Sequence, residues 1–173
     1  ISDISAASKL DSDLSKDELQ KININKLISG LVDIRKTSLK GIKISLNLDQ
    51  KAYIMGNEDR LVQVLDNLIA NAISFSPQTG TITFTSLIQN GKVHISVMDQ
   101  GPGIPESKLN TIFERFYSER PQGEEFGTHT GLGLSIVKQI INAHDGSVYA
   151  ENVYGKNNNI LGSKFTFILT IVS

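Results

Sequence analysis

The feature that most constrains the fold is a pair of strand-like runs joined by a tight turn signal. Residues 81–88 (TITFTSLI) and 92–99 (KVHISVMD) are rich in β-branched and apolar residues, and they flank Gln89-Asn90-Gly91. Asn-Gly supplies two residues that tolerate positive φ, as the turn of a tight β-hairpin requires. The chain is therefore expected to contain an antiparallel hairpin against which the remaining elements pack.

The rest of the chain alternates between helical and strand patterns. Apolar residues recur at helical spacing in three segments, 25–40, 59–73 and 132–144. Strand patterns occupy four others, 41–48, 51–55, 147–153 and 163–171, and we expect the first two of these to pair with each other. Gly146 is expected to end the third helix. The order predicts an α+β fold, a two-layer sandwich with helices packed on one face of a mixed sheet.

Composition excludes several classes of function. The formal net charge of −1 argues against a nucleic-acid partner held mainly through phosphate contacts. The absence of cysteine excludes disulfides and thiolate chemistry. The histidines at 94, 129 and 144 show no spacing that suggests a shared metal.

Residues 100–130 are rich in proline and glycine, with one short helix expected near 106–112. Irregular stretches of such length inside a compact domain are usually functional, as lids or binding loops.

Two asparagines stand out in DNLIANAISFSP, residues 66–77. Asn67 and Asn71 are four residues apart, so their side chains share one helix face. An asparagine side-chain carbonyl can ligate Mg²⁺, which takes oxygen ligands. A solvated helix face would explain the same pattern.

Two further segments carry polar or charged groups beside loops. In MDQGPGIP, residues 98–105, Asp99 ends a strand and could accept a hydrogen bond from the amino group of adenine, although a plain Asp turn fits too. In FERFYSERP, residues 113–121, aromatic residues interleave with Arg115 and Arg120. This is either the end of a packed helix or a segment that brings cations to a phosphate.

The last segment, GTHTGLGLSIV at 127–137, places Gly131 and Gly133 where a helix should begin. Glycines there let a ligand approach the backbone, and helix N-termini favour phosphate. The pattern is neither a dinucleotide fingerprint, since Ile136 takes the third glycine position, nor a P-loop.

In this order, the four segments resemble the N, G1, F and G2 boxes of the catalytic ATP-binding (HATPase_c) domain of bacterial sensor histidine kinases. That family belongs to the GHKL superfamily and has the Bergerat ATP-binding fold. The resemblance covers about residues 21–173 and includes AHDGSVYAENVYG and GSKFTF. SFSP together with FYSERP most resembles the ChvG/BvrS type.

The resemblance implies a set of site residues for ATP and Mg²⁺. Asn67 and Asn71 would be catalytic, with Asn71 as the Mg²⁺ ligand and Asn67 arranging the triphosphate. Asp99 would recognise adenine. The remaining ATP-binding positions would be Ser74, Phe75, Gly101, Gly103, Ile104, Tyr117, Thr130, Gly131, Leu132, Gly133 and Leu134.

Two positions depart from the family pattern. Ser74 stands where a phosphate-contacting lysine is frequent, and Ser118 where an arginine often follows Phe-Tyr. Both changes remove positive charge, for which Arg115 and Arg120 are the nearby candidates to compensate.

The implied organisation is that of a fragment of a longer protein. Residues 1–15 would end the second helix of a dimerisation and histidine-phosphotransfer domain, 16–24 would be a linker and first strand, and 25–173 the catalytic domain, with an ATP lid at about 106–130. The intact protein would be a homodimer in the bacterial inner membrane, with this segment cytoplasmic and monomeric.

The implied activity is transfer of the γ-phosphoryl group of ATP to a histidine on the upstream domain, and from there to a response regulator. Hydrolytic GHKL members carry a glutamate at the position of Asn67, and an amide cannot act as a general base at neutral pH. Two alternatives stay open, a degenerate ATP-binding module without kinase activity and a hydrolytic GHKL ATPase.

Overall fold

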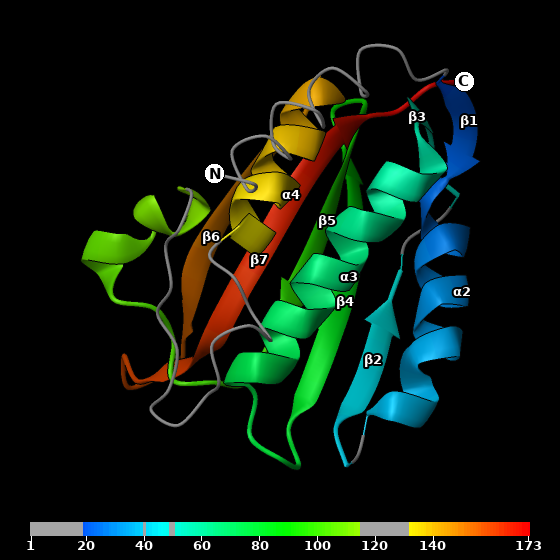
Figure 1. Ribbon diagram of the computed structural model, residues 1–173. Helices are drawn as coiled ribbons and strands as arrows, with labels where there is room; N and C mark the ends of the chain where they lie inside the picture. The colour runs from blue at the N-terminus through cyan, green and yellow to red at the C-terminus, as the bar shows by residue number, and fades with distance from the viewer. Residues whose placement is uncertain (1–18, 40, 49–50, 115–131) are drawn as a thin grey trace.

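The computed structural model describes residues 19–39, 41–48, 51–114 and 132–173. Figure 1 shows two layers, with helices lying against one face of a twisted sheet. The helices are α2 (Ile24–Arg35), α3 (Glu58–Phe75) and α4 (Leu132–Ala143). The strands are β1 (Gln20–Asn23), β2 (Lys43–Asn47), β3 (Tyr53–Gly56), β4 (Thr81–Gln89), β5 (Lys92–Met98), β6 (Ser147–Tyr154) and β7 (Ile160–Thr170). No helix in these ranges is long and apolar enough to cross a membrane.

The main sheet is mixed and has the order β2-β4-β5-β7-β6. Only the β2–β4 pair is parallel, and the connection between these strands includes β3 and α3. The expected hairpin is confirmed, since Gln89 pairs with Lys92 across Asn90 and Gly91, both of which have positive φ (54° and 74°). The α+β sandwich with helices on one face is therefore confirmed as well.

The expected pairing of the strands at 41–48 and 51–55 is wrong. β3 pairs antiparallel with β1 in a separate two-stranded sheet, and Lys21 Nζ lies 4.8 Å from the centroid of the Tyr53 ring across this pair. β2 instead takes the edge position beside β4. Alternation of apolar residues indicates which side chains point inward, but it does not identify the neighbouring strand.

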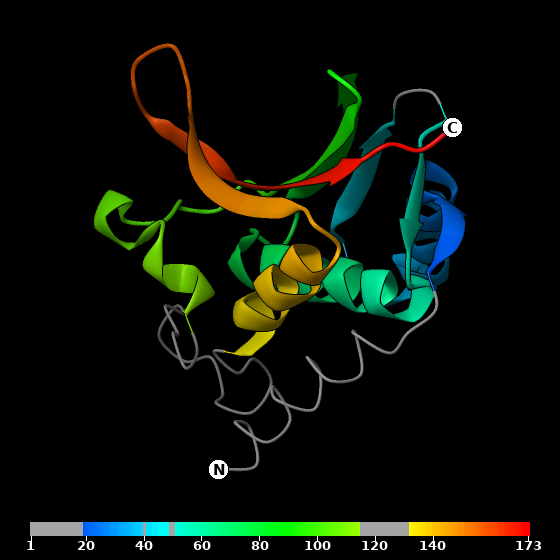
Figure 2. The same cartoon turned by 90° about the horizontal axis from the view of Figure 1, so that it is seen from above.

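The core lies between the helices and the sheet, and Figure 2 shows α3 and α4 beneath the curved sheet. The apolar stripe of α3, including Leu61, Leu65 and Leu68, is fully buried there. It packs in one cluster with Phe84 of β4 and Phe167 of β7, which are both 0% exposed. The helical period that predicted this element therefore also predicted which face it buries.

The helix ends use local polar chemistry. Asn57 caps α3 by accepting a hydrogen bond from the backbone N–H of Arg60 (2.9 Å). The N–H of Asn57 in turn donates to Nε2 of His144 (3.1 Å), which ties the start of α3 to the end of α4. α4 ends one residue before His144, and the left-handed residue beyond it is Asp145 (φ 59°), not Gly146.

Gly146 is needed for a different reason from the expected one. Its N–H donates to the carbonyl of Ile141 (2.9 Å), and a Cβ at this position would overlap the carbonyl oxygen of Ile168. Glycine at position 146 therefore allows the chain leaving α4 to pass directly against the backbone of β7. Gly30, on the exposed side of α2, has nothing within 4 Å of the place where a Cβ would be.

These two glycines should respond in opposite ways to substitution by alanine. Gly30→Ala should raise the free energy of unfolding by about 0.5–1 kcal/mol, because alanine is the better helix former. Gly146→Ala should lower it by about 1–3 kcal/mol, because the added methyl overpacks the junction of α4 and β7. Urea denaturation of both variants measures the difference, and a neutral Gly146→Ala would contradict the close approach.

Candidate functional site

One face of α3 carries Asn67, Asn71 and Phe75 at intervals of four residues. Asn67 donates a hydrogen bond from Nδ2 to the carbonyl of Gly133, in the first turn of α4 (3.2 Å). At the other end of this row, the carbonyl of Phe75 lies directly against Gly101, where a Cβ would overlap it. The face of α3 therefore connects the glycine-rich start of α4 with the loop that follows β5.

Asn71 lies between these two contacts with its amide unused. Its side chain is 4% exposed, and neither Oδ1 nor Nδ2 has a hydrogen-bond partner among the described residues. Burying an amide without partners costs free energy, on the order of 1–3 kcal/mol. An amide oxygen and an amide NH₂ are thus available at this point for a ligand.

Asp99 is almost completely buried, at 1% exposure. Oδ1 accepts hydrogen bonds from the N–H of Gly101 (2.8 Å) and of Ser163 (3.2 Å), and Oδ2 accepts one from the hydroxyl of Ser163 (2.8 Å). A carboxylate offers about four lone-pair positions, so room remains for about one further donor. This arrangement can bind one exocyclic amino group of a base.

Ser163 was not among the predicted site residues, although it lies within the quoted segment GSKFTF. Its position is set by the neighbouring Gly162, where a Cβ would overlap the backbone carbonyl of Asp99. The N–H of Asp99 also donates to the carbonyl of Ser163 (3.0 Å). A glycine followed by a hydroxyl residue at the start of an apolar strand was the available signal.

The loop after Asp99 is held from the other side by Asn152, a second residue that the sequence analysis missed. Ile104 donates its N–H to Oδ1 of Asn152 (2.8 Å), and Nδ2 of Asn152 donates to the carbonyl of Ile104 (2.7 Å). Gly103 has a φ of 85°, which favours glycine, and a Cβ there would lie 2.8 Å from Oδ1 of Asn152. The signal was a polar residue among the inward positions of β6, where Val148 and Ala150 pack on the core.

At the start of α4, a Cβ on Gly133 would meet none of the described residues within 4 Å. Leu134 is half-buried and packs against the core. Ser74 and Phe75 are half-buried in the last turn of α3. Leu132 begins α4, and its side chain lies outside the described parts. So do five other predicted residues: Arg115, Tyr117, Arg120, Thr130 and Gly131.

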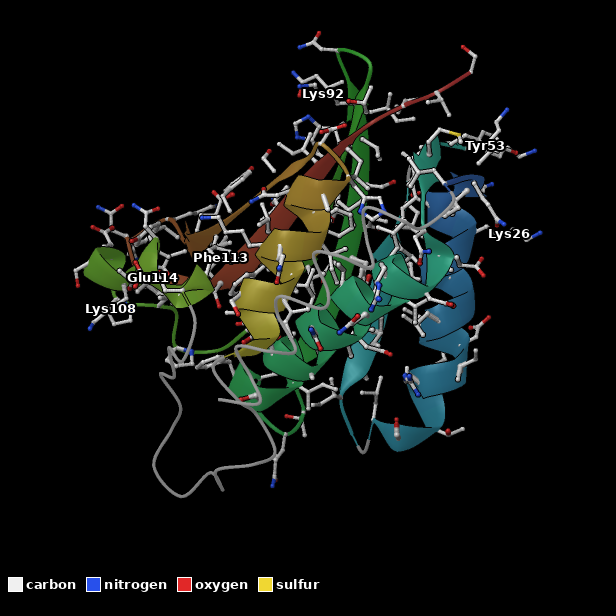
Figure 3. All side chains as sticks on the ribbon, turned by 45° about the horizontal axis from the view of Figure 1, so that its top comes forward. Lys26, Tyr53, Lys92, Lys108, Phe113 and Glu114 are labelled. Atoms are coloured by element: carbon white, nitrogen blue, oxygen red, sulfur yellow. The ribbon has the colours of Figure 1, made fainter. Side chains whose placement is uncertain are left out.

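The first part of the expected lid, residues 106–114, contains two short 3-10 turns in place of the single helix expected near 106–112. These are η2 (Glu106–Lys108) and η3 (Thr111–Phe113). Phe113 packs edge-on against Phe165 of β7, with ring centroids 6.1 Å apart. Figure 3 shows Lys108, Phe113 and Glu114 on the side where β6 and β7 lie, and Lys26 and Tyr53 on the opposite side. The segment at 113–121 therefore begins with an aromatic residue that packs against β7.

The site is braced from α2 by an ion pair. Nε and Nη2 of Arg35 donate to the two carboxylate oxygens of Asp66 (3.0 and 2.9 Å), one residue before Asn67, and this hydrogen bonding raises the pKa of Arg35. A groove of about 640 Å³ beside this pair, lined by residues of β1, α2 and α3, includes none of the predicted site residues. The candidate site is therefore separate from this groove.

Comparison with known proteins gives consistent matches. The family model for histidine kinase-, DNA gyrase B-, and HSP90-like ATPases matches residues 56–172. Sensor protein ChvG of Rhizobium meliloti (strain 1021) is 41% identical over 179 residues, which cover 98% of this chain and 31% of ChvG. The chain thus spans less than a third of the length of that relative.

Two solved structures share the fold at appreciable identity. The catalytic domain of histidine kinase ThkA aligns with a TM-score of 0.76 and 32% identity, covering 89% of this chain and 96% of that one. ThkA in complex with response regulator protein TrrA aligns with a TM-score of 0.74 and 29% identity, covering 99% of this chain and 48% of that one.

The unused amide of Asn71 predicts a stability gain on substitution. Asn71→Leu should raise the free energy of unfolding of the ligand-free protein by about 1–2 kcal/mol, because an apolar group of similar size replaces a buried amide without partners. Asn67→Leu is the matched control and should destabilise, since it leaves the carbonyl of Gly133 without its donor. Thermal unfolding of both variants without nucleotide measures this, and destabilisation by Asn71→Leu would show that its amide is satisfied.

Proposed function

This chain belongs to the family of histidine kinase-, DNA gyrase B-, and HSP90-like ATPases, and we propose that it is the ATP-binding catalytic domain of a sensor histidine kinase. Family membership confirms the resemblance found in the four sequence segments. The proposed reaction is transfer of the γ-phosphoryl group of ATP to a histidine side chain. The acceptor lies on an upstream dimerisation domain, and a response regulator receives the group next.

The observation that carries the proposal is the row of contacts along α3. Asn67 contacts the start of α4, Phe75 contacts the loop of Asp99, and the unpaired amide of Asn71 lies between them. A nucleotide has a matching layout, with a base at one end and phosphates at the other. We place the base at Asp99 and the phosphates at the N-terminus of α4, where backbone N–H groups favour anions.

The residues present fit a magnesium nucleotide. Oδ1 of Asn71 accepts no hydrogen bond from the described residues, and this buried oxygen beside the proposed phosphate site is of the kind that Mg²⁺ accepts. Asn71 would hold the ion, which would supply positive charge beside the phosphates. No residue in the described parts of the chain comes within 4 Å of a Cβ placed on Gly133, which suits the approach of phosphate oxygens to the backbone of the first turn of α4.

Asn67 supports transfer over hydrolysis. Its amide NH₂ is engaged by the carbonyl of Gly133, and an amide does not accept a proton from water at neutral pH. Its role is to hold the start of α4 against α3, which positions the proposed phosphate site. Phosphoryl transfer needs mainly positioning and charge stabilisation, so this role is sufficient.

The acceptor histidine is proposed to lie outside the present sequence. His144 is occupied between Asn57 and the carbonyl of Ile140, His94 lies on β5, and His129 falls outside the described residues.

The coverage of ChvG, of which this chain matches only 31%, supports a longer protein. We propose that this protein is a membrane-anchored homodimer whose dimerisation helix ends at about residue 15, with the catalytic domain at 25–173 and its lid at about 106–130. The ThkA structure with a response regulator supports the proposed final acceptor.

Nucleotide binding tests the proposal first. Calorimetric titration with a non-hydrolysable ATP analogue should show a Kd in the micromolar to submillimolar range that depends on Mg²⁺. Asn71→Leu should weaken binding in Mg²⁺ by about tenfold or more, equivalent to about 1.4 kcal/mol. Gly30→Ala, far from the site, is the control and should bind as the wild type does.

The outcome separates the candidate functions. Wild-type protein that binds no nucleotide at millimolar concentration would refute an ATP site. Binding without transfer to a rejoined upstream histidine domain would favour a nucleotide-binding module, a candidate supported by Ser74 at a position where the family often has lysine. Rapid phosphate release by the isolated domain would favour a hydrolase.

Base recognition is tested separately at Asp99. Asp99→Ala should abolish the preference for ATP over GTP, because a buried group that must be paired is what rejects the wrong base. The measurement is the ratio of the two Kd values with Mg²⁺ present. A variant that is folded and still discriminates would move base recognition to another residue.

A further inference from the structure

Two residues on one rung of the sheet hold both ends of the loop that follows β5. In the antiparallel pairing of β6 and β7, Asn152 lies directly opposite Ser163, so their side chains project from the same face. That face is the helix side, because the neighbouring inward residues Ala150 and Phe165 pack on the core. Ser163 binds the carboxylate of Asp99, and Asn152 binds the backbone of Ile104.

Asn152 uses its amide both as acceptor and as donor to one residue, which other side chains of its size cannot do. The amide oxygen accepts from the N–H of Ile104 at 2.8 Å while the amide nitrogen donates to the carbonyl of the same residue at 2.7 Å. A carboxylate has no donor for that carbonyl, and a serine hydroxyl is too short to make both bonds. Asn152 is 8% exposed and Ile104 is 6% exposed, so these groups are shielded from water.

The composition of this loop makes it flexible unless other residues hold it. Between Asp99 and Ile104 it contains Gly101 and Gly103, and glycine loses more conformational freedom on ordering than any other residue. A loop that is already ordered in the free protein binds a ligand more tightly, because binding then requires no loss of conformational entropy in the loop.

We propose that Asn152 is a positioning residue for base recognition, which by holding Ile104 fixes the loop from Gly101 to Ile104 relative to Asp99. The ligand is a purine nucleotide whose base presents an amino donor to that carboxylate. This inference rests on the proposed ATP site. Asn152 acts through the backbone of Ile104, whereas Asp99 makes the base contact.

Tyr154 offers a natural comparison on the same strand. Its hydroxyl donates to Oε1 of Glu106 at 2.7 Å, and this hydrogen bond raises the pKa of Tyr154. Tyr154 is 45% exposed, so water replaces its bond readily when the hydroxyl is removed. The buried bonds of Asn152 have no such substitute.

The experiment compares ADP with GDP in three variants. Asn152→Ser and Asn152→Asp should weaken ADP binding by about 5- to 30-fold, the effect of losing about one to two net hydrogen bonds. GDP affinity should change by less than about twofold, because the carboxylate of Asp99 does not select guanine. Thr166→Val, the control, removes a buried bond to Ser96 (2.9 Å) elsewhere in the sheet and should leave the GDP-to-ADP ratio of Kd values unchanged.

Calorimetric titration or competition with a fluorescent nucleotide gives the Kd values, with the melting temperature recorded for each variant. Folded Asn152 variants that bind ADP as tightly as the wild type would overturn the inference while leaving the ATP site intact. Equal losses for ADP and GDP would also overturn it, since they would assign Asn152 a general structural role. Wild-type protein that binds no ADP would instead refute the proposed function on which the inference rests.

Hydrogen exchange of the wild type needs no variant and applies if neither substitution folds. The amide proton of Ile104 should exchange as slowly as the amides of β5 in the ligand-free protein, because it donates to a buried oxygen. Exchange at the rate of exposed loop amides would show that the loop is not held before nucleotide binds.

Discussion

A buried carboxylate at position 99 is the constraint on which the site depends. A carboxylate that is 1% exposed persists only where donors satisfy it, and here the chain supplies three of them from Gly101 and Ser163. These donors require the chain to turn back immediately after β5 and require β7 to lie flush against it. Glycine at 162 permits the second condition, because no side chain would fit beside the carbonyl of Asp99. The loop after β5 and the start of β7 are thus held together by a single group.

The structure treats the two asparagines of α3 in opposite ways. Asn67 is engaged by α4, and the ion pair of Arg35 with Asp66 holds the same turn of α3 to α2. One turn later, Asn71 is buried, and its amide has no partner within the described ranges. A sequence selected for stability alone would place an apolar residue there, so the unpaired amide is the kind of local cost that functional sites carry. Its neighbours on the same helix face, Asn67 and Phe75, each contact another element, α4 and the loop after β5 respectively.

Local patterns predicted the elements well, and non-local relations less well. The hairpin at Asn90-Gly91 and the buried stripe of α3 follow from turn chemistry and helical period, which act within a few residues. The partner of β3 depends on which edge is free after folding, and no local pattern encodes that. Asp145 took the left-handed position in place of Gly146, because Gly146 was needed for close packing against β7.

The same difference between local patterns and non-local relations applies to the candidate site. The four motifs identified the family, and they placed Asn67, Asn71 and Asp99 on the elements where the structure has them. Asn152 and Ser163 were missed because their importance comes from partners about 50 to 60 residues away in sequence. The roles of Arg115 and Arg120 stay predictions, since both lie outside the described residues.

Selectivity for the base follows from the hydrogen bonds that the carboxylate of Asp99 already accepts from the chain. With three donors from the chain in place, the carboxylate of Asp99 can accept about one more and can donate nothing. Adenine presents an amino group where guanine presents a carbonyl oxygen, and that oxygen would face a carboxylate with no proton between them. Pairing with adenine also requires that the loop hold the base at hydrogen-bonding distance from that carboxylate. Asn152 supplies that condition on Ile104, so base choice is determined jointly by the group that contacts the base and by the amide that keeps the loop still.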